Sequence, residues 1–331
     1  MSESSPPYAG LTPDVVLAAA ESVGLVPDAR IYPLNSYENR VYQLGLETGG
    51  FVILKFYRPQ RWSNEQILEE QAFTSRLSEL DIPVVTVREF NGLGSLLEHA
   101  GFRFSVFPHQ RGRPPELDNL DNLIVLGRFI GRIHAVGATA RFAHRPRLSV
   151  ERFAVQSREY LLANDFLPLD LRPAYETLTT DLLDRLHTLM PDSERWQTLR
   201  LHGDCHPGNV LWCDGTPHFV DFDDTLSGPA IQDLWMLLSG DRDQRQGQLR
   251  ELVEGYNEFY EFRAEELVLI ETLRTMRLMH YAAWLARRWT DPAFPLSFPW
   301  FNSERYWAEH ILELREQLSV HDEPPLELMP Q

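Results

Sequence analysis

The chain has 331 residues, of which 43% are hydrophobic and 24% are charged, as is typical of a globular protein with about two domains. Its formal net charge of -17 argues against a nucleic acid or an anionic membrane as partner, because both are themselves negatively charged. No apolar run is long enough to span a bilayer, two cysteines are too few for a disulfide framework, and the N-terminus does not resemble a signal peptide, so we expect a cytoplasmic protein.

The first hundred residues alternate between helix and strand signals. Thr12 suits the N-cap of a helix that begins at Pro13, and Gly24 suits its end. Segment 63–80 carries apolar residues at helical spacing, which predicts a second helix. Short apolar segments bounded by turn residues predict strands over 31–34, 40–46, 51–57, 84–90 and 102–107.

Segment 108–115 is poor in apolar residues and is interpreted as a hinge between a small β-rich lobe (1–107) and a larger, mainly helical lobe (116–331). A strand hairpin near 199–224 interrupts the second lobe. Helices are predicted over 119–136, 150–162, 173–190, 230–238, 246–262, 265–288 and 303–318. The predicted fold class is therefore α+β, with two lobes.

The hairpin region carries the most informative motif of the chain. Asp214-Gly215 between two apolar-rich runs predicts a tight hairpin. Its two arms then place Asn209 within about one residue of facing Asp221. An amide oxygen and a carboxylate at one end of a hairpin are the hard oxygen ligands that Mg²⁺ takes.

Asp204 lies five residues before Asn209, in a loop that contains glycine and proline. This spacing matches the kinase catalytic loop, in which the aspartate accepts a proton from the attacking hydroxyl and the asparagine binds metal. Each residue also has a plain structural interpretation, such as a turn or a helix N-terminus. Their coincidence favours the kinase interpretation. His202 and His206 are expected to hold the loop rather than to act as acid or base.

Lys55 lies on a predicted strand, on a face that is otherwise apolar. A buried ammonium needs an anionic partner, and in a kinase such a lysine holds the phosphates. A lysine on an exposed edge strand is the alternative. Glu65, Glu69 and Glu70 on the following helix are the candidate partners, and the residues alone leave the choice among them open.

Four segments make the chain similar to the bacterial stress response kinase A family, within the wider group of aminoglycoside phosphotransferases, choline kinases and homoserine kinases. They are 34–42 with its Ser-Tyr-Glu-Asn-Arg run, 55–59, 203–209, and 228–235 with its Gln-Asp-Leu-Trp run. The resemblance covers essentially the whole chain. It implies a protein-kinase-like fold, with an ATP-binding N-terminal lobe and a catalytic C-terminal lobe.

The resemblance also implies a function: an ATP- and Mg²⁺-dependent serine/threonine protein kinase of the stress response, which transfers the γ-phosphate of ATP to a hydroxyl. We expect the enzyme to act as a monomer. The implied site residues are Asp204 as catalytic base, Asp221 and Asn209 as Mg²⁺ ligands, Ser36, Lys55, Glu70 and Phe107 around ATP, and Asp233 as a brace of the catalytic loop.

Two departures from ordinary protein kinases keep other functions open. The chain has no Gly-x-Gly-x-x-Gly loop, and Asp233 follows Asp221 by only 12 positions, which leaves no room for a long activation loop. The acceptor is thus either a protein or a small hydroxyl-bearing molecule, such as an amino alcohol, a sugar or an aminoglycoside. A non-catalytic nucleotide-binding scaffold is the third alternative. Aromatic residues 284–307 could line an acceptor cleft, although their helical spacing is more typical of a core.

Overall fold

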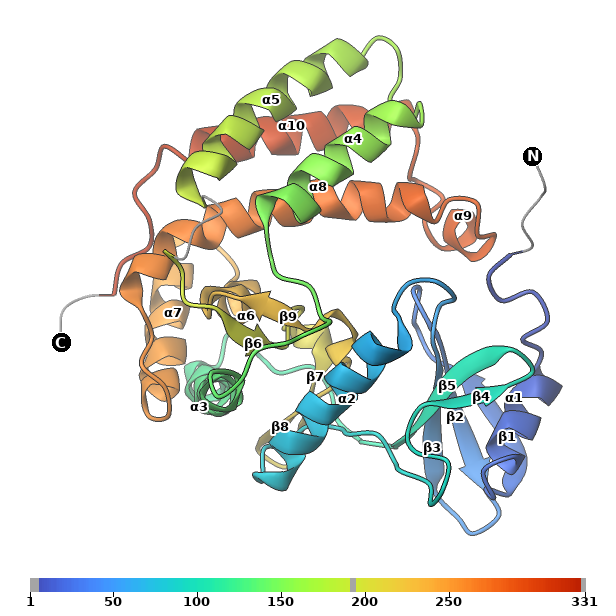
Figure 1. Ribbon diagram of the computed structural model, residues 1–331. Helices are drawn as coiled ribbons and strands as arrows, with labels where there is room; N and C mark the ends of the chain where they lie inside the picture. The colour runs from blue at the N-terminus through green and yellow to red at the C-terminus, as the bar shows by residue number, and fades with distance from the viewer. Residues whose placement is uncertain (1–5, 191–194, 329–331) are drawn as a thin grey trace. The chain divides into compact units, whose positions relative to one another are not determined.

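The computed structural model describes residues 6–190 and 195–328, which fall into two compact units (Figure 1). The first unit comprises Met1–Glu116, Phe142–Arg145 and His206–Thr225, and the rest of the chain forms the second. Residues 1–5, 191–194 and 329–331 of the two predicted lobes lie outside the described residues. Within the described part, no helix is both long and apolar enough to cross a membrane.

The first unit is built on an antiparallel sheet of five strands in the order β1-β2-β3-β5-β4. Its strands are β1 (Pro27–Pro33), β2 (Arg40–Leu46), β3 (Phe51–Phe56), β4 (Leu97–His99) and β5 (Phe102–Pro108). Two helices accompany the sheet, α1 (Pro13–Glu21) and α2 (Asn64–Glu79). As predicted, Thr12 caps α1. In addition, Ser63 caps α2 through a reciprocal capping box with Gln66.

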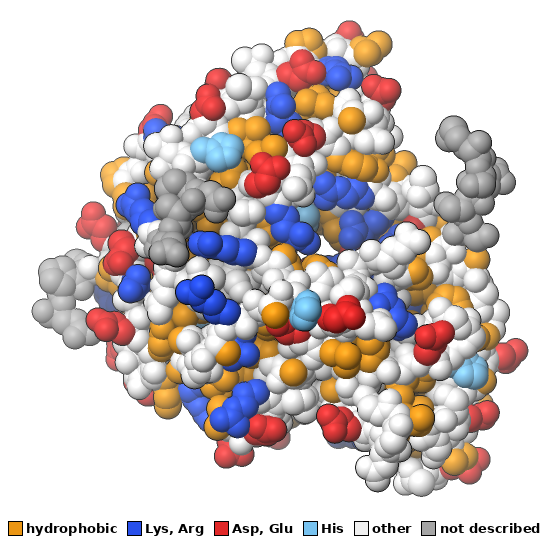
Figure 2. Space-filling model, in the orientation of Figure 1, with side chains coloured by type: hydrophobic (Ala, Val, Ile, Leu, Met, Phe, Trp, Pro, Cys, Tyr) orange, Lys and Arg blue, Asp and Glu red, His pale blue; other side chains and the backbone are white. Residues whose placement is uncertain are grey.

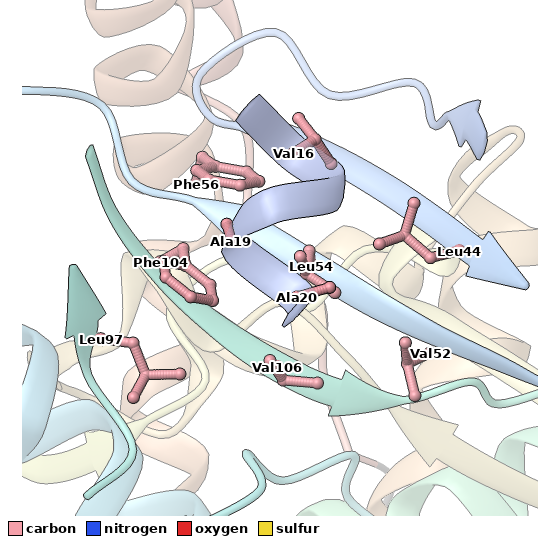
Figure 3. Packing of buried hydrophobic residues seen from close by; sticks show 10 residues of the cluster. All are labelled: Val16, Ala19, Ala20, Leu44, Val52, Leu54, Phe56, Leu97, Phe104 and Val106. Atoms are coloured by element: carbon pink, nitrogen blue, oxygen red, sulfur yellow. The ribbon is translucent and has the colours of Figure 1, made fainter. Parts of the chain in front are cut away.

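One face of the sheet is covered by α1 and forms the core of this unit (Figure 3). Side chains alternate along a strand, so Leu54 and Phe56 of β3 turn toward this core and are fully buried. Lys55, between them, must point to the opposite face. The core consists of Val16, Ala19, Ala20, Leu44, Val52, Leu54, Phe56, Leu97, Phe104 and Val106.

The opposite face of the sheet contacts α2, because the Gln71 amide donates to Tyr57, directly after β3, and to Ser105 on β5. The predicted strand over 84–90 is wrong. Val84 instead makes an isolated parallel bridge to Phe219, residues 85–89 run as irregular backbone, and Phe90 bridges only to the nearby Gly94. The apolar segment that follows α2 thus connects the rest of this unit to a hairpin. The hairpin consists of β7 (Val210–Cys213) and β8 (Thr216–Phe219).

The second unit is mainly helical, as predicted. Its helices are α3 (Leu120–Gly137), α4 (Gln156–Ala163), α5 (Arg172–Leu189), α6 (Ile231–Leu234), α7 (Arg242–Asn257), α8 (Ile270–Arg287), α9 (Ala293–Ser297) and α10 (Glu304–Val320). A π-helical turn, Glu151–Val155, leads into α4. Two short strands, β6 (Leu199–Leu201) at the start of the predicted hairpin region and β9 (Leu226–Gly228) just beyond its end, pair with each other.

Close packing of α3 on α7 depends on glycine. A methyl group at Gly127 would lie 2.0 Å from the carbonyl oxygen of Leu252, and one at Gly255 would lie 2.0 Å from that of Ile124. Only a residue without a side chain allows the two backbones to approach this closely. The contact places His134 of α3 beside Tyr256 of α7, with 2.9 Å between Nδ1 and the phenol oxygen.

The aromatic residues near the C-terminus pack mainly against one another. Trp307 is fully buried and lies in edge contact with Tyr175 of α5, while Phe301 packs between Trp289 and Trp307. Trp284 and Trp289 are half-buried, and Trp300 is exposed, with 46% of its surface accessible. The core interpretation of these residues is therefore the better one.

Candidate active site

In the first unit, Lys55 lies at the centre of a cluster of buried charges. Its Nζ is 2.8 Å from Oδ1 of Asp221 and 3.1 Å from Oδ1 of Asp223. Burial by itself disfavours the charged ammonium, but the two carboxylates outweigh it and raise the pKa of Lys55 well above its usual value. The lysine therefore stays protonated, and its charge is directed at the end of β8.

Asp223 is the most connected member of this cluster, and its role was not predicted from the sequence. It is buried, and it accepts hydrogen bonds from Arg61 and, at 3.1 Å, from the side-chain amide of Asn39. Burial tends to raise the pKa of a carboxyl group, but Lys55 and Arg61 dominate, so the pKa of Asp223 is lowered far below its usual range. Asp223 therefore links strand β3, the loop before α2 and the loop that enters β2.

Asn39 explains why the Ser-Tyr-Glu-Asn-Arg loop has a defined shape without a glycine-rich sequence. Its amide nitrogen donates to Asp223, and its amide oxygen accepts from the backbone N–H of Arg58 at 3.1 Å. Ser36 is half-buried in the same loop, between β1 and β2. The loop is thus anchored at its C-terminal end to the cluster that holds Lys55.

The three candidate glutamates of α2 have different environments. Glu69 accepts the backbone N–H groups of residues 143, 144 and 145, with N–O distances of 2.5, 2.8 and 2.7 Å. Glu70 is buried, and this burial raises its pKa to about 7 although Lys55 and Arg145 act to lower it. The ion pair partners of Lys55 among the described residues are nevertheless Asp221 and Asp223, not a glutamate. The predicted pairing of Lys55 with Glu70 is absent because the aspartates already satisfy the ammonium.

The hairpin forms as predicted and sets the geometry of the candidate metal ligands. Its turn residues Asp214 and Gly215 both have positive φ, +50° and +78°, which two-residue hairpin turns require. Val210 pairs with Phe219, so Asn209 lies opposite Val220, whose N–H donates to its carbonyl at 3.0 Å. Asn209 is thus one residue out of register with Asp221.

Asp221 combines a strained backbone with an accessible carboxylate. Its φ and ψ of 58° and 60° lie in the left-handed region, which costs a residue with a side chain about 1–3 kcal/mol. Its side chain is 52% exposed although one oxygen contacts Lys55. A carboxylate and an amide oxygen on adjoining hairpin arms fit a hard cation that takes few protein ligands, such as Mg²⁺.

Phe107 shares the face of the sheet that carries Lys55. In the β3–β5 register Lys55 pairs with Ser105, and Ile53 pairs with Phe107. Phe107 is two residues from Ser105 along β5, so its side chain points to the same face as that of Lys55. Phe107 is half-buried. The structure thus brings Lys55, Phe107, Asn209 and Asp221 into the first unit, together with Ser36 in its loop.

In the second unit, Asp233 organises the loop that carries Asp204. The buried carboxylate of Asp233 accepts the backbone N–H groups of His202 and Gly203, each at 2.8 Å. His134 supports the same carboxylate, with Nε2 3.0 Å from Oδ2. Asp233 therefore braces the loop that carries Asp204, as expected, and His134 is a supporting residue that no local sequence pattern indicated.

Asp204 itself is half-buried at the end of this loop, and its Oδ1 lies 2.5 Å from Nη1 of Arg277 on α8. The neighbouring histidines have structural contacts, as expected. His202 is buried and its Nδ1 accepts the backbone N–H of Asp204 at 3.3 Å. In the first unit, His206 accepts the N–H of Gly208 at 3.0 Å and so begins the short 3₁₀ turn Pro207–Asn209.

Comparison with known proteins identifies the family. Residues 30–267 match the model of the phosphotransferase enzyme family. Stress response kinase A of Escherichia coli O157:H7 is 45% identical over 330 residues, which cover 100% of this chain and 99% of the relative. Serine/threonine protein kinase RdoA of Salmonella typhimurium LT2 is 42% identical over 334 residues, with the same coverage.

Solved structures support the fold at lower identity. An amicoumacin kinase in complex with AMP-PNP, Ca²⁺ and Ami superimposes with a TM-score of 0.71 at 21% identity, covering 95% of both chains. A microcompartment-associated aminopropanol kinase gives a TM-score of 0.68 at 19% identity, covering 93% of this chain and 97% of the other. The predicted kinase-like α+β fold is confirmed, and the chain is a kinase that belongs to the phosphotransferase enzyme family.

Proposed function

We propose that the protein transfers the γ-phosphate of ATP to a serine or threonine hydroxyl of a protein, with Mg²⁺ as the metal. The observation that carries this proposal is the charge arrangement around Lys55. The buried ammonium of Lys55 contacts the exposed carboxylate of Asp221. At such a site, bound polyphosphate and a divalent cation can replace this internal ion pair.

Each residue has one role in this proposal. Lys55 binds the α- and β-phosphates, Asp221 and Asn209 hold the metal, and Phe107 and Ser36 contact the adenine and the phosphates, respectively. Bound Mg²⁺ would neutralise charge that develops on the phosphoryl oxygens. Asp204 accepts the proton of the attacking hydroxyl, and Asp233 keeps the Asp204 loop in place through two backbone hydrogen bonds. ATP and Mg²⁺ are abundant in the cytoplasm, which is the proposed location.

A small-molecule hydroxyl kinase is the second candidate. Between Asp221 and Asp233 the chain passes directly through a 3₁₀ turn, the short strand β9 and the start of α6, with no long loop for a regulatory phosphorylation. The solved relatives include an amicoumacin kinase and an aminopropanol kinase. The name of a more similar sequence relative, serine/threonine protein kinase RdoA, supports a protein acceptor instead.

One assay separates these candidates. The purified protein is incubated with labelled ATP and Mg²⁺, first with casein, myelin basic protein and serine peptides, and then with amino alcohols, sugars and aminoglycosides. Label on protein that disappears with Asp204→Ala supports the main proposal. Label on small molecules alone would favour the second candidate, and binding of ATP without any transfer would favour a scaffold.

A further inference from the structure

We infer that Arg277 selects an acceptor with a negatively charged group beside its hydroxyl, and that this acceptor is a serine or threonine peptide with flanking acidic residues. This inference rests on the proposed protein kinase function. Arg277 reaches Asp204 from α8, 73 positions further along the chain, with 2.5 Å between Nη1 and Oδ1. A guanidinium therefore stands at the atom that is proposed to accept the acceptor's proton.

The Arg277–Asp204 pair is partly open to solvent. The arginine side chain is 47% exposed and the aspartate side chain 24% exposed. An ion pair of this kind is weak, because water screens it, so an incoming anion can take over one of the N–H groups of the guanidinium at little cost. The planar guanidinium has five N–H donors, so it can contact Asp204 and a second carboxylate or phosphate at the same time.

The charge on α8 differs in sign from the charge of the protein as a whole. Figure 2 shows Lys and Arg side chains gathered along the region of α8. The helix and its C-cap carry Arg274, Arg277, Arg287 and Arg288 against a single acid, Glu271, a balance of +3, whereas the chain carries -17. Such a local concentration of arginine in an acidic protein favours an anionic ligand.

The acid of α8 is already occupied by arginine. Glu271 contacts Arg245 at 3.2 Å and Arg274 at 3.3 Å. Arg287 makes its hydrogen bond to the backbone oxygen of Gln156, at 2.9 Å, and lies over the ring of Tyr160. Burial lowers the pKa of Arg287.

The aromatic residues on the same face of α8 do not form a site for a cationic acceptor. Tyr281 and Trp284 follow Arg277 at helical spacing and stack with their rings 5.7 Å apart. The guanidinium of Arg288 lies 5.1 Å from the Trp284 ring centre. That ring already holds a cation, whereas a kinase for an amino alcohol would offer it to the substrate. An acidic peptide laid along this face meets Arg277 first and Arg288 further on.

The test is a comparison of three serine peptides that differ only in their flanking residues, which are aspartate, glutamine or arginine. For the wild-type protein we expect kcat/KM for the acidic peptide to exceed that for the neutral one about tenfold, which one charge-assisted hydrogen bond can supply. Arg277→Gln should remove this preference, and Arg277→Lys should restore part of it. Arg305→Gln on α10, where the side chain is 85% exposed, is the matched loss of one positive charge and should keep the preference.

Binding separates a failure of this inference from a failure of the proposed function. Fluorescence anisotropy of labelled peptides, with AMP-PNP and Mg²⁺ present, measures acceptor affinity without transfer. Acidic-peptide binding that Arg277→Gln weakens supports the inference even where no peptide is phosphorylated, and the protein kinase proposal alone then fails. Equal kcat/KM and equal binding for all three peptides, or an equal loss on all of them in Arg277→Gln, would overturn the role of Arg277 in selection.

Discussion

Asp223 and Asp233 are buried carboxylates, one in each unit, and their charges are balanced by different kinds of donor. Asp223 contacts the side chains of Lys55, Arg61 and Asn39. Asp233 instead binds two backbone N–H groups and His134. In the proposed mechanism, the first arrangement fixes charged side chains that exchange partners when a nucleotide binds. The second fixes a backbone conformation that stays constant while Asp204 accepts the proton.

Loss of Asp223 should have the largest effect on stability. Asp223→Ala leaves the buried cations Lys55 and Arg61 with fewer counter-charges, so we expect a destabilisation of about 3 kcal/mol or more. Asp224→Ala is the matched control, because Asp224 also contacts Arg61 but its side chain is 47% exposed, and it should cost less than about 1 kcal/mol. Urea denaturation measures both. Equal losses would show that the charge cluster does not depend on Asp223.

The second prediction concerns the pH dependence that Glu70 adds to the first unit. Its pKa is raised to about 7 in the folded protein, so the folded state binds this proton more tightly than the unfolded chain does. Stability should therefore fall as the pH rises from about 4.5 to about 7, by about 3 kcal/mol at most. Glu70→Gln should remove this pH-dependent contribution to stability, whereas Glu79→Gln at the exposed end of α2 should not. Tm curves of Glu70→Gln and wild type that run parallel across this window would contradict the prediction.

Asp233→Asn should have a smaller effect on stability than Asp223→Ala, and a different effect on activity. The amide keeps one acceptor oxygen, so one of the backbone N–H groups of His202 and Gly203 loses its partner, at about 1–3 kcal/mol. We expect kcat to fall while the Kd for Mg·ATP changes little, because the charge cluster around Lys55 is untouched. Steady-state kinetics and calorimetry check this. A weakened Kd with unchanged kcat would reverse the assignment of roles.

Glu69 provides the smallest expected effect, because it has the same kind of contacts as Asp233 at a partly exposed position. It accepts three consecutive N–H groups at the edge of the first unit, where water can replace a lost partner. Glu69→Gln should therefore cost about 1 kcal/mol in urea denaturation, less than Asp233→Asn. A larger cost for Glu69→Gln would show that burial is not what distinguishes these two carboxylates.

Local chemistry explains which parts of the molecule could be predicted from the sequence. The caps Thr12 and Ser63 and the turn Asp214-Gly215 act over a few residues, so their patterns are visible in the chain. Segment 84–90 also has a strand-like pattern, but it forms only two isolated bridges, from Val84 to the distant Phe219 and from Phe90 to Gly94. Tertiary contacts overrode local propensity at this point.

The residues of the candidate site also differ in how far they could be predicted. The sequence motif indicated Asp204, Asn209 and Asp221 as candidates, because their spacing is short and regular. The partners that hold them come from far away in the sequence: Arg61 lies 162 positions before Asp223, and His134 lies 99 before Asp233. The pairing of Lys55 could not be read from α2 alone, because the two aspartates reach it from the hairpin.

The most direct test of the central claim measures Mg·ATP binding and phosphotransfer on the same two variants. Asp204→Ala should bind Mg·ATP within about twofold of wild type, because Asp204 is proposed to act on the acceptor, yet its transfer rate should fall about a hundredfold or more. Asp221→Asn should lose Mg·ATP binding itself, because the metal loses its charged ligand. Near wild-type transfer by Asp204→Ala, or unchanged Mg·ATP binding by Asp221→Asn, would contradict the account.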